Sequence, residues 1–183
     1  MSTIINGSSP SITFSDSTTQ TTAFTGSASQ ITSGTLPSAQ LPTGSVLQVV
    51  NATNSTYITT SSGTFASTGV TATVTPKFTT SKVLVSINLN GLQSQTANQQ
   101  IRLYLYKNGS FLAYLDDFIG YGLAAATGLS SSYTYFDSPA STSSTTYAVY
   151  WANNGSGNAL TLNNYVAGAN RTMSSITLME IAG

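Results

Sequence analysis

The sequence predicts an all-β protein: an antiparallel jelly-roll β-sandwich of about 8–10 strands, preceded by an extended N-terminal arm. Three observations lead to this fold class. From Thr43 onward, short runs of β-branched and aromatic residues alternate with Gly, Pro, Ser and Asn turn signals. Several of these runs alternate apolar and polar residues with the period of two that a half-buried strand requires. Residues 1–42, by contrast, are mostly Ser, Thr, Gly and Gln, with Asp16 as their one charged residue.

Residues 1–42 are the predicted arm. Their apolar residues come in small islands, and Pro37 and Pro42 favour extended conformations in the residues before them. Such a segment cannot bury enough apolar area to fold alone. Two alternatives remain open: a disordered tail, or an extended arm that becomes ordered by pairing with copies of itself or with a neighbouring protein.

The stretch Ile101–Asp117 carries the strongest local signal. Asn108-Gly109 separates two apolar, aromatic-rich runs, and this dipeptide is typical of a type I′ hairpin turn because both central residues need a positive φ. In the first run the residues alternate between two faces. One face carries Ile101, Leu103 and Leu105, and the other carries Arg102, Tyr104 and Tyr106. The first strand of the hairpin therefore has an apolar face for the core and an aromatic face for a second contact.

The remaining runs complete the predicted sandwich. The predicted strands are Ser45–Ala52, Tyr57–Thr60, Thr64–Thr75, Lys82–Leu89, Ile101–Lys107, Phe111–Phe118, Leu129–Phe136, Thr145–Ala152, Ala159–Tyr165 and Met173–Ile181. Val83–Leu89 has a clear core stripe at its odd positions. Met173–Ile181 is apolar on both parities, which predicts a strand in the middle of a sheet whose outer face another subunit covers. Gly120–Gly128 is predicted to be a loop because its glycines disfavour a helix.

Composition excludes several function classes. The 183 residues are 40% hydrophobic and 5% charged, and they include no Cys and no His, so disulfides, thiol catalysis and histidine-based catalysis or zinc binding are excluded. The five basic residues form no run, which argues against nucleic-acid binding. The N-terminal residues do not resemble a secretory signal, and no apolar run approaches the ~20 residues that cross a bilayer. We expect no membrane insertion, no cofactor and no enzymatic activity.

Two portions of the chain resemble proteins of tailed bacteriophages. Ser11–Phe24 (SITFSDSTTQTTAF) resembles an element of the FpDgTTQTTA type in phage fibre proteins, with Ser15 and Ser17 where Pro and Gly are usual. Ala28–Val50 resembles the connector that precedes C-terminal fibre heads. In the body, Thr75–Val85 (TPKFTTSKVLV) and Ile176–Gly183 (ITLMEIAG) resemble phage fibre-head and virion-surface domains. Those heads are similar to trimeric jelly rolls of the tumour-necrosis-factor and complement type.

The resemblance implies a non-enzymatic virion protein, exposed on the tail or the capsid. Residues 1–42 would attach to another virion structural protein or braid within a homotrimer, and residues 43–183 would form the jelly-roll head. The implied trimer interface contains Tyr104, Tyr106 and Tyr150. The implied task is host-surface binding as a small trimeric tail fibre. The alternative is a capsid fibre or capsid decoration protein, held on the phage head by its arm. The short arm supports this alternative, because long tail fibres usually carry a substantial attachment domain and residues 1–42 are too few for one.

Two candidate sites have structural alternatives. The candidate host-glycan contact is Tyr133, Tyr135 and Trp151 with Asn153 and Asn154, since aromatic rings pack on sugar rings and amides bond hydroxyls. Its alternative places Trp151 in the core and the asparagines in a turn. The carboxylates Asp116, Asp117 and Asp137 could bind calcium or act as a glycosidase pair. Because adjacent carboxylates on a strand point to opposite faces, a solvated strand end is the favoured interpretation, and we predict no metal site.

Overall fold

The structure is a computed structural model of the 183-residue chain, and it describes residues 4–6, 11–13, 17, 19–20, 37–154, 158–164 and 171–183. The chain divides into two compact units, Met1–Pro37 and Ser38–Gly183. In the first unit, β1 (Ile4–Asn6), β2 (Ser11–Thr13) and β3 (Thr19–Gln20) form an antiparallel sheet. Of the rest of the predicted extended arm, residues 17 and 37–42 are described, with a short 3-10 helix at Ser38–Gln40, and the other residues lie outside the described part.

The second unit begins with a short 3-10 helix, η2 (Ser38–Gln40), and the regular elements that follow it in the described residues are all strands. These strands are β4 (Val46–Asn54), β5 (Ile58–Thr60), β6 (Ala66–Val74), β7 (Lys82–Ser94), β8 (Ile101–Lys107), β9 (Ser110–Ile119), β10 (Leu129–Asp137), β11 (Thr145–Asn153), β12 (Leu160–Leu162) and β13 (Ser174–Ile181). Every strand predicted from Ser45 onward overlaps one of them, although Tyr165, the last residue of one prediction, lies outside the described part. No helix among the described residues is long and apolar enough to cross a membrane.

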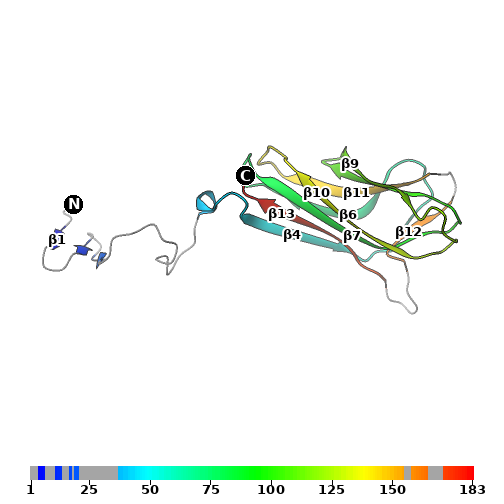
Figure 1. Ribbon diagram of the computed structural model, residues 1–183, viewed down its shortest axis with the longest axis horizontal. Helices are drawn as coiled ribbons and strands as arrows, with labels where there is room; N and C mark the ends of the chain where they lie inside the picture. Colours follow the sequence, from blue (N-terminus) through cyan, green and yellow to red (C-terminus); the bar gives the residue numbers. More distant parts are fainter. Residues whose placement is uncertain are drawn as a thin grey trace. The chain divides into compact units, whose positions relative to one another are not determined.

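The strands form two antiparallel sheets packed face to face (Figure 1). One sheet has the order β4-β13-β7-β12-β5, and β10 also pairs with β7, on the edge opposite β13. The second sheet has the order β6-β11-β8-β9. The predicted all-β sandwich is confirmed, and the arrangement is compatible with a jelly roll. β13 lies between β4 and β7, as the apolar residues on both of its parities predicted. Gly120–Gly128 contains no helix, in agreement with the predicted loop.

The core lies between the sheets and follows the period-two pattern. Val83, Val85, Ile87 and Leu89 of β7 are all fully buried, so the predicted core stripe is correct. Trp151 of β11, in the other sheet, belongs to the same core cluster and is also fully buried. Because one face of each sheet fills this core, most strands leave their alternate residues on the outer faces of the two sheets, and these faces carry the candidate binding surfaces.

The β8–β9 hairpin has the predicted geometry. Asn108 and Gly109 have φ values of 50° and 78°, and Lys107 pairs with Ser110 across the two-residue turn. The Asn108 side chain also accepts a hydrogen bond of 2.8 Å from the backbone N–H of Thr146 in β11. The turn is therefore anchored to the neighbouring strand, which fixes the aromatic face of β8 within the sheet.

Candidate binding surfaces

An aromatic patch lies on the outer face of the β6-β11-β8-β9 sheet. We define it as Phe65, Tyr104, Tyr106, Phe111, Tyr114 and Tyr150, whose rings form one connected chain of contacts. Phe65 and Tyr114 approach Tyr104 with centroid distances of 4.0 and 5.0 Å, and Tyr106 stacks on Tyr150 at 4.1 Å. Phe111 lies between the two groups and contacts Tyr104, Tyr106 and Tyr114. The cross-strand register brings these rings together, since Tyr104 pairs with Tyr150 on one side and Tyr114 on the other.

The exposed part of the patch differs from the predicted interface. Tyr104 is only 3% exposed because the rings around it cover it, whereas Phe111 and Tyr114 are 49% and 70% exposed. Tyr106 and Tyr150 are half-buried. The structure thus groups the three predicted tyrosines on one face, but it corrects the role of Tyr104, which is inaccessible to a partner. The surface that a partner would meet is formed mainly by Phe65, Phe111 and Tyr114, which the sequence prediction missed.

The surroundings of the aromatic patch are electrically balanced. Arg102 lies 3.8 Å from Asp117, and Lys107 is 2.9 Å from Asp137. On the β6 side of the same sheet, the exposed hydroxyls of Thr71 and Thr73 follow the outward parity of the strand. Rings and hydroxyls therefore share one sheet face, beside which the charged side chains Arg102 and Lys107 are paired with carboxylates.

A second apolar surface, the aliphatic face, lies on the outer side of the β4-β13-β7-β10 strands. The pairing aligns Val49, Met179, Leu84 and Phe136 in one row across these strands, and Val46 and Ile181 lie opposite each other in the next row. Val46, Val49 and Phe136 are 53%, 55% and 55% exposed. The rest of this outer face is polar, with Asn51, Thr177, Ser86 and Thr134 in the row on the other side.

The predicted glycan contact is not assembled. Trp151 is fully buried in the core and Asn153 is 1% exposed, so neither can reach a glycan. Tyr133 and Tyr135 lie on β10 and pack inward against the core. Asn154 is exposed but lies on the opposite sheet, where it hydrogen-bonds Arg102 and Gln100. The alternative, with Trp151 in the core, is correct. The sequence indicated this position, because Trp151 alternates along the strand with Tyr147 and Val149 and therefore faces the same side.

The Tyr133 hydroxyl donates a 3.2 Å hydrogen bond to Asp116. Burial, together with the nearby Asp116 carboxylate, raises the pKa of Tyr133 to about 12. The Tyr133 phenol is therefore protonated at neutral pH. It positions Asp116 and offers no acid–base chemistry.

The acidic residues form structural networks. Asp137 is buried and accepts hydrogen bonds from Lys107 Nζ at 2.9 Å and the Tyr147 hydroxyl at 2.6 Å, so the expected solvated position is wrong for this residue. Burial raises the pKa of Asp137, but the bonds from Tyr147 and Lys107 outweigh burial and hold the pKa below its usual value. Among the described residues, no three acidic side chains gather into a possible metal site.

The second buried acid, Glu180, was not identified from the sequence. Its carboxylate accepts bonds from Ser81 Oγ and the Lys77 backbone N–H, both at 2.6 Å, and from Gln48 Nε2 at 2.5 Å. Burial raises the pKa of Glu180, yet these donors outweigh burial and lower the pKa overall. The sequence pattern does indicate that Glu180 is buried, because this residue continues the alternating buried stripe of Ile176 and Leu178. The carboxylate joins β13, β4 and the β6–β7 loop, and no hydrolytic partner faces it in the described structure.

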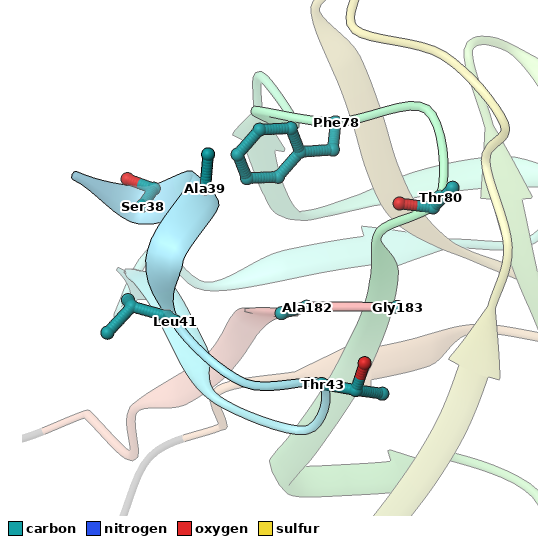
Figure 2. Close-up of a pocket in the computed structure, with 8 residues that line it drawn as sticks. All are labelled: Ser38, Ala39, Leu41, Thr43, Phe78, Thr80, Ala182 and Gly183. Atoms are coloured by element: carbon teal, nitrogen blue, oxygen red, sulfur yellow. The ribbon is translucent and has the colours of Figure 1, made fainter. Parts of the chain in front are cut away.

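A pocket of about 280 Å³ lies beside this network, next to the η2 helix. It is lined by Ser38, Ala39, Leu41, Thr43, Phe78, Thr80, Ala182 and Gly183 (Figure 2). The Phe78 ring turns toward Ala39, and the other lining side chains are small, aliphatic or hydroxyl-bearing (Figure 2). The lining side chains provide shape and hydrogen bonds, without an acid or a base.

Comparisons with known proteins give only distant structural likenesses. No family model matches the chain, and no curated protein matches it. T=1 particles derived from infectious bursal virus superpose with a TM-score of 0.41 and 12% identity, over 75% of this chain and 37% of that chain. The Gt strain of infectious bursal disease virus gives a TM-score of 0.40 and 13% identity, over 82% of this chain and 42% of that chain. The chain spans well under half the length of these viral proteins, and TM-scores of this size carry no argument about its role.

Proposed function

We propose that this chain is a non-enzymatic structural protein of a virion, and more specifically a small homotrimeric tail fibre of a bacteriophage that binds the host surface. The resemblance of Ser11–Phe24 and Ala28–Val50 to phage fibre elements supports the proposal, as does the all-β sandwich of the second unit. Residues 1–42 attach the protein to another virion structural protein. The alternative remains a capsid fibre or decoration protein, attached to the phage head through the same arm.

The aromatic patch is the single observation that supports the binding role most directly. Phe111 and Tyr114 present large rings to solvent on a sheet face, where each would add about 0.5–1.5 kcal/mol beyond area burial in a good aromatic contact. The adjacent cations are paired with carboxylates, so an anionic ligand would gain little from them. Aromatic rings beside hydroxyls suit a neutral glycan, which offers apolar C–H faces and hydrogen-bonding hydroxyls. The proposed host-surface ligand is therefore a neutral glycan.

A binding experiment tests this role. The full-length protein carrying Phe111→Ser and Tyr114→Ser should bind host cells, and polysaccharide purified from their envelope, at least tenfold more weakly than the wild type. The reason is that two ring contacts are worth roughly 1–3 kcal/mol together, and the several heads of the proposed trimer multiply the difference. The matched control is Ser175→Ala on the opposite sheet, which should bind normally. Equal binding by both variants would refute the patch as the host contact.

Location on the particle separates the two virion roles. Electron microscopy of virions labelled with an antibody against residues 38–183 should show label at the tail for a fibre and over the head for a capsid protein. Virions without label at either place would refute both.

A further inference from the structure

We infer that the aliphatic face is the surface through which copies of this chain associate, and that the aromatic patch faces outward from the assembly. The inference rests on the homotrimer of the proposed function and names its interface. It differs from the sequence prediction, which placed Tyr104, Tyr106 and Tyr150 at the three-fold axis.

The geometry of the sandwich allows one of the two surfaces to line an axis. The two sheets of the sandwich lie against each other (Figure 1), and the core lies between them. The aliphatic face is the outer side of one sheet, and the aromatic patch is the outer side of the other. The two surfaces therefore point in opposite directions. If copies associated through both surfaces, the heads would stack in an open row. In a closed trimer, each subunit instead presents the same surface to the three-fold axis.

The chemistry of the aliphatic face suits a permanent contact. Its central row, Val49, Met179, Leu84 and Phe136, contains no side chain with a strong hydrogen-bonding group, so water and polar ligands gain nothing from it. Interfaces between obligate copies resemble a divided core in this respect. The aromatic patch has four tyrosine hydroxyls, and its central ring, Tyr104, is already covered by its own chain. Of the two surfaces, the aliphatic face is therefore the one whose central row offers a ligand apolar contact alone.

The dimensions and charge of this face fit a second copy. Four strands about 4.8 Å apart and about eight residues long cover roughly 19 by 26 Å, or about 500 Å² in projection. This is the same order as the ~800 Å² of accessible surface that each partner contributes to a standard interface. Lys82 is the one charged residue at the outward positions of these strands, and its Nζ bonds Ser138 Oγ at 2.9 Å. Copies can therefore approach without strong repulsion.

The position of Val46 adds a further reason. Val46 is the first residue of β4 and is part of the aliphatic face. Association through this face brings the start of β4 in each copy beside the axis. The first residues of β4 in the three copies then lie close together, which is the arrangement that joint attachment to one virion protein needs.

Light scattering after size exclusion, at micromolar concentration, tests the inference on the full chain. We expect a trimer for the wild type, a monomer of 19.0 kDa for Val49→Ser with Phe136→Ser, and a trimer for the matched control Phe111→Ser with Tyr114→Ser. All four positions are at least 49% exposed, so the fold should survive, which circular dichroism would verify. A trimeric aliphatic-face variant or a monomeric control would overturn the inference alone. The second result would restore Tyr106 and Tyr150 to the axis. A monomeric wild type would overturn the trimer of the proposed function as well.

A crosslinking experiment gives an answer even if the serine variant unfolds. The chain has no cysteine, so Met179→Cys introduces a single thiol at the centre of the aliphatic face, and Thr73→Cys introduces one on the opposite sheet. A short bis-maleimide should join subunits of the Met179→Cys protein and leave the Thr73→Cys protein uncrosslinked. The reverse pattern, or no crosslink in a trimeric Met179→Cys protein, would overturn the inference.

Discussion

Replacing Glu180 with glutamine tests the polar network at the end of the sandwich where β4 begins and β13 ends. The substitution keeps the volume of the side chain and removes its charge. Glu180 is fully buried and accepts bonds from Gln48, Lys77 and Ser81, which belong to β4 and to the loop between β6 and β7. In the variant, the amide nitrogen must face one of these donors. We expect a substantial loss of stability with the fold retained.

The magnitude follows from the donors. Hydrogen bonds to a charged group are worth about 1.5–3 kcal/mol and neutral ones about 0.5–1.5 kcal/mol, so three bonds lose roughly 3 kcal/mol together. One buried donor left without an acceptor adds about 1–3 kcal/mol. We expect the free energy of unfolding to fall by about 4–6 kcal/mol. For a domain of this size, that corresponds to a Tm lower by roughly 10–20 °C.

The loss should depend on pH with a definite sign. The donors lower the pKa of Glu180 in the folded state relative to the unfolded chain. A carboxyl with a depressed folded pKa contributes stability that is present above its unfolded pKa, near ~4.3, and is lost as pH falls through the folded pKa. The wild type and the variant should therefore differ fully at pH 7 and progressively less below about pH 4.

Urea denaturation of both proteins at pH 7 and pH 3, at equal concentration, measures this difference. Working at one concentration keeps any contribution from self-association the same for each pH. A loss below about 1 kcal/mol at pH 7 would show that water replaces the carboxylate, against the reasoning above. A difference that stays constant on acidification would show that packing, and not the charge, is responsible.

Two further substitutions test other parts of the head. Asp137→Asn should cost about 2–3 kcal/mol, because it removes the charge that Lys107 and Tyr147 contact, and urea denaturation would measure the loss. Gly91→Ala should prevent soluble expression or lower the Tm sharply, because its φ is +65° and a Cβ there would lie 2.6 Å from a backbone nitrogen. Gly109→Ala is the control in open space, with φ +78°, and should cost only about 1–2 kcal/mol; equal losses for the two glycines would contradict the steric argument.

The fold was predictable because its signals are local. Val83–Leu89 alternates cleanly, and the Asn108-Gly109 dipeptide specifies its own turn, so strand positions follow from neighbouring residues. The same parity rule would have placed Glu180 among the buried positions of β13. It would also have placed Trp151 in the core, as the alternative interpretation stated.

The binding surfaces were less predictable because they depend on strand order. Phe65 reaches Tyr104 only because β6, β11 and β8 are neighbours, and nothing in the local sequence specifies that order. Phe111 and Tyr114 lie on β9, where register shifts against β8 interrupt the alternation, so counting residues does not assign them to a face. The aliphatic face likewise needs the pairing of β4, β13, β7 and β10 before its row becomes visible.

The distribution of polar and apolar residues over the head argues that its outer faces, more than its core, determine how it is used. Glu180 and Asp137 are buried, although the chain has only five acidic residues, while Val49, Phe136 and Tyr114 face water. A free monomer places its few charges outside, where they keep molecules apart. Burying two acids uses them to join strands and leaves the sheet faces without repulsion. Substitutions that make this head a soluble monomer should therefore lie on the aliphatic face, and changes to the core stripe should unfold it without changing its partners.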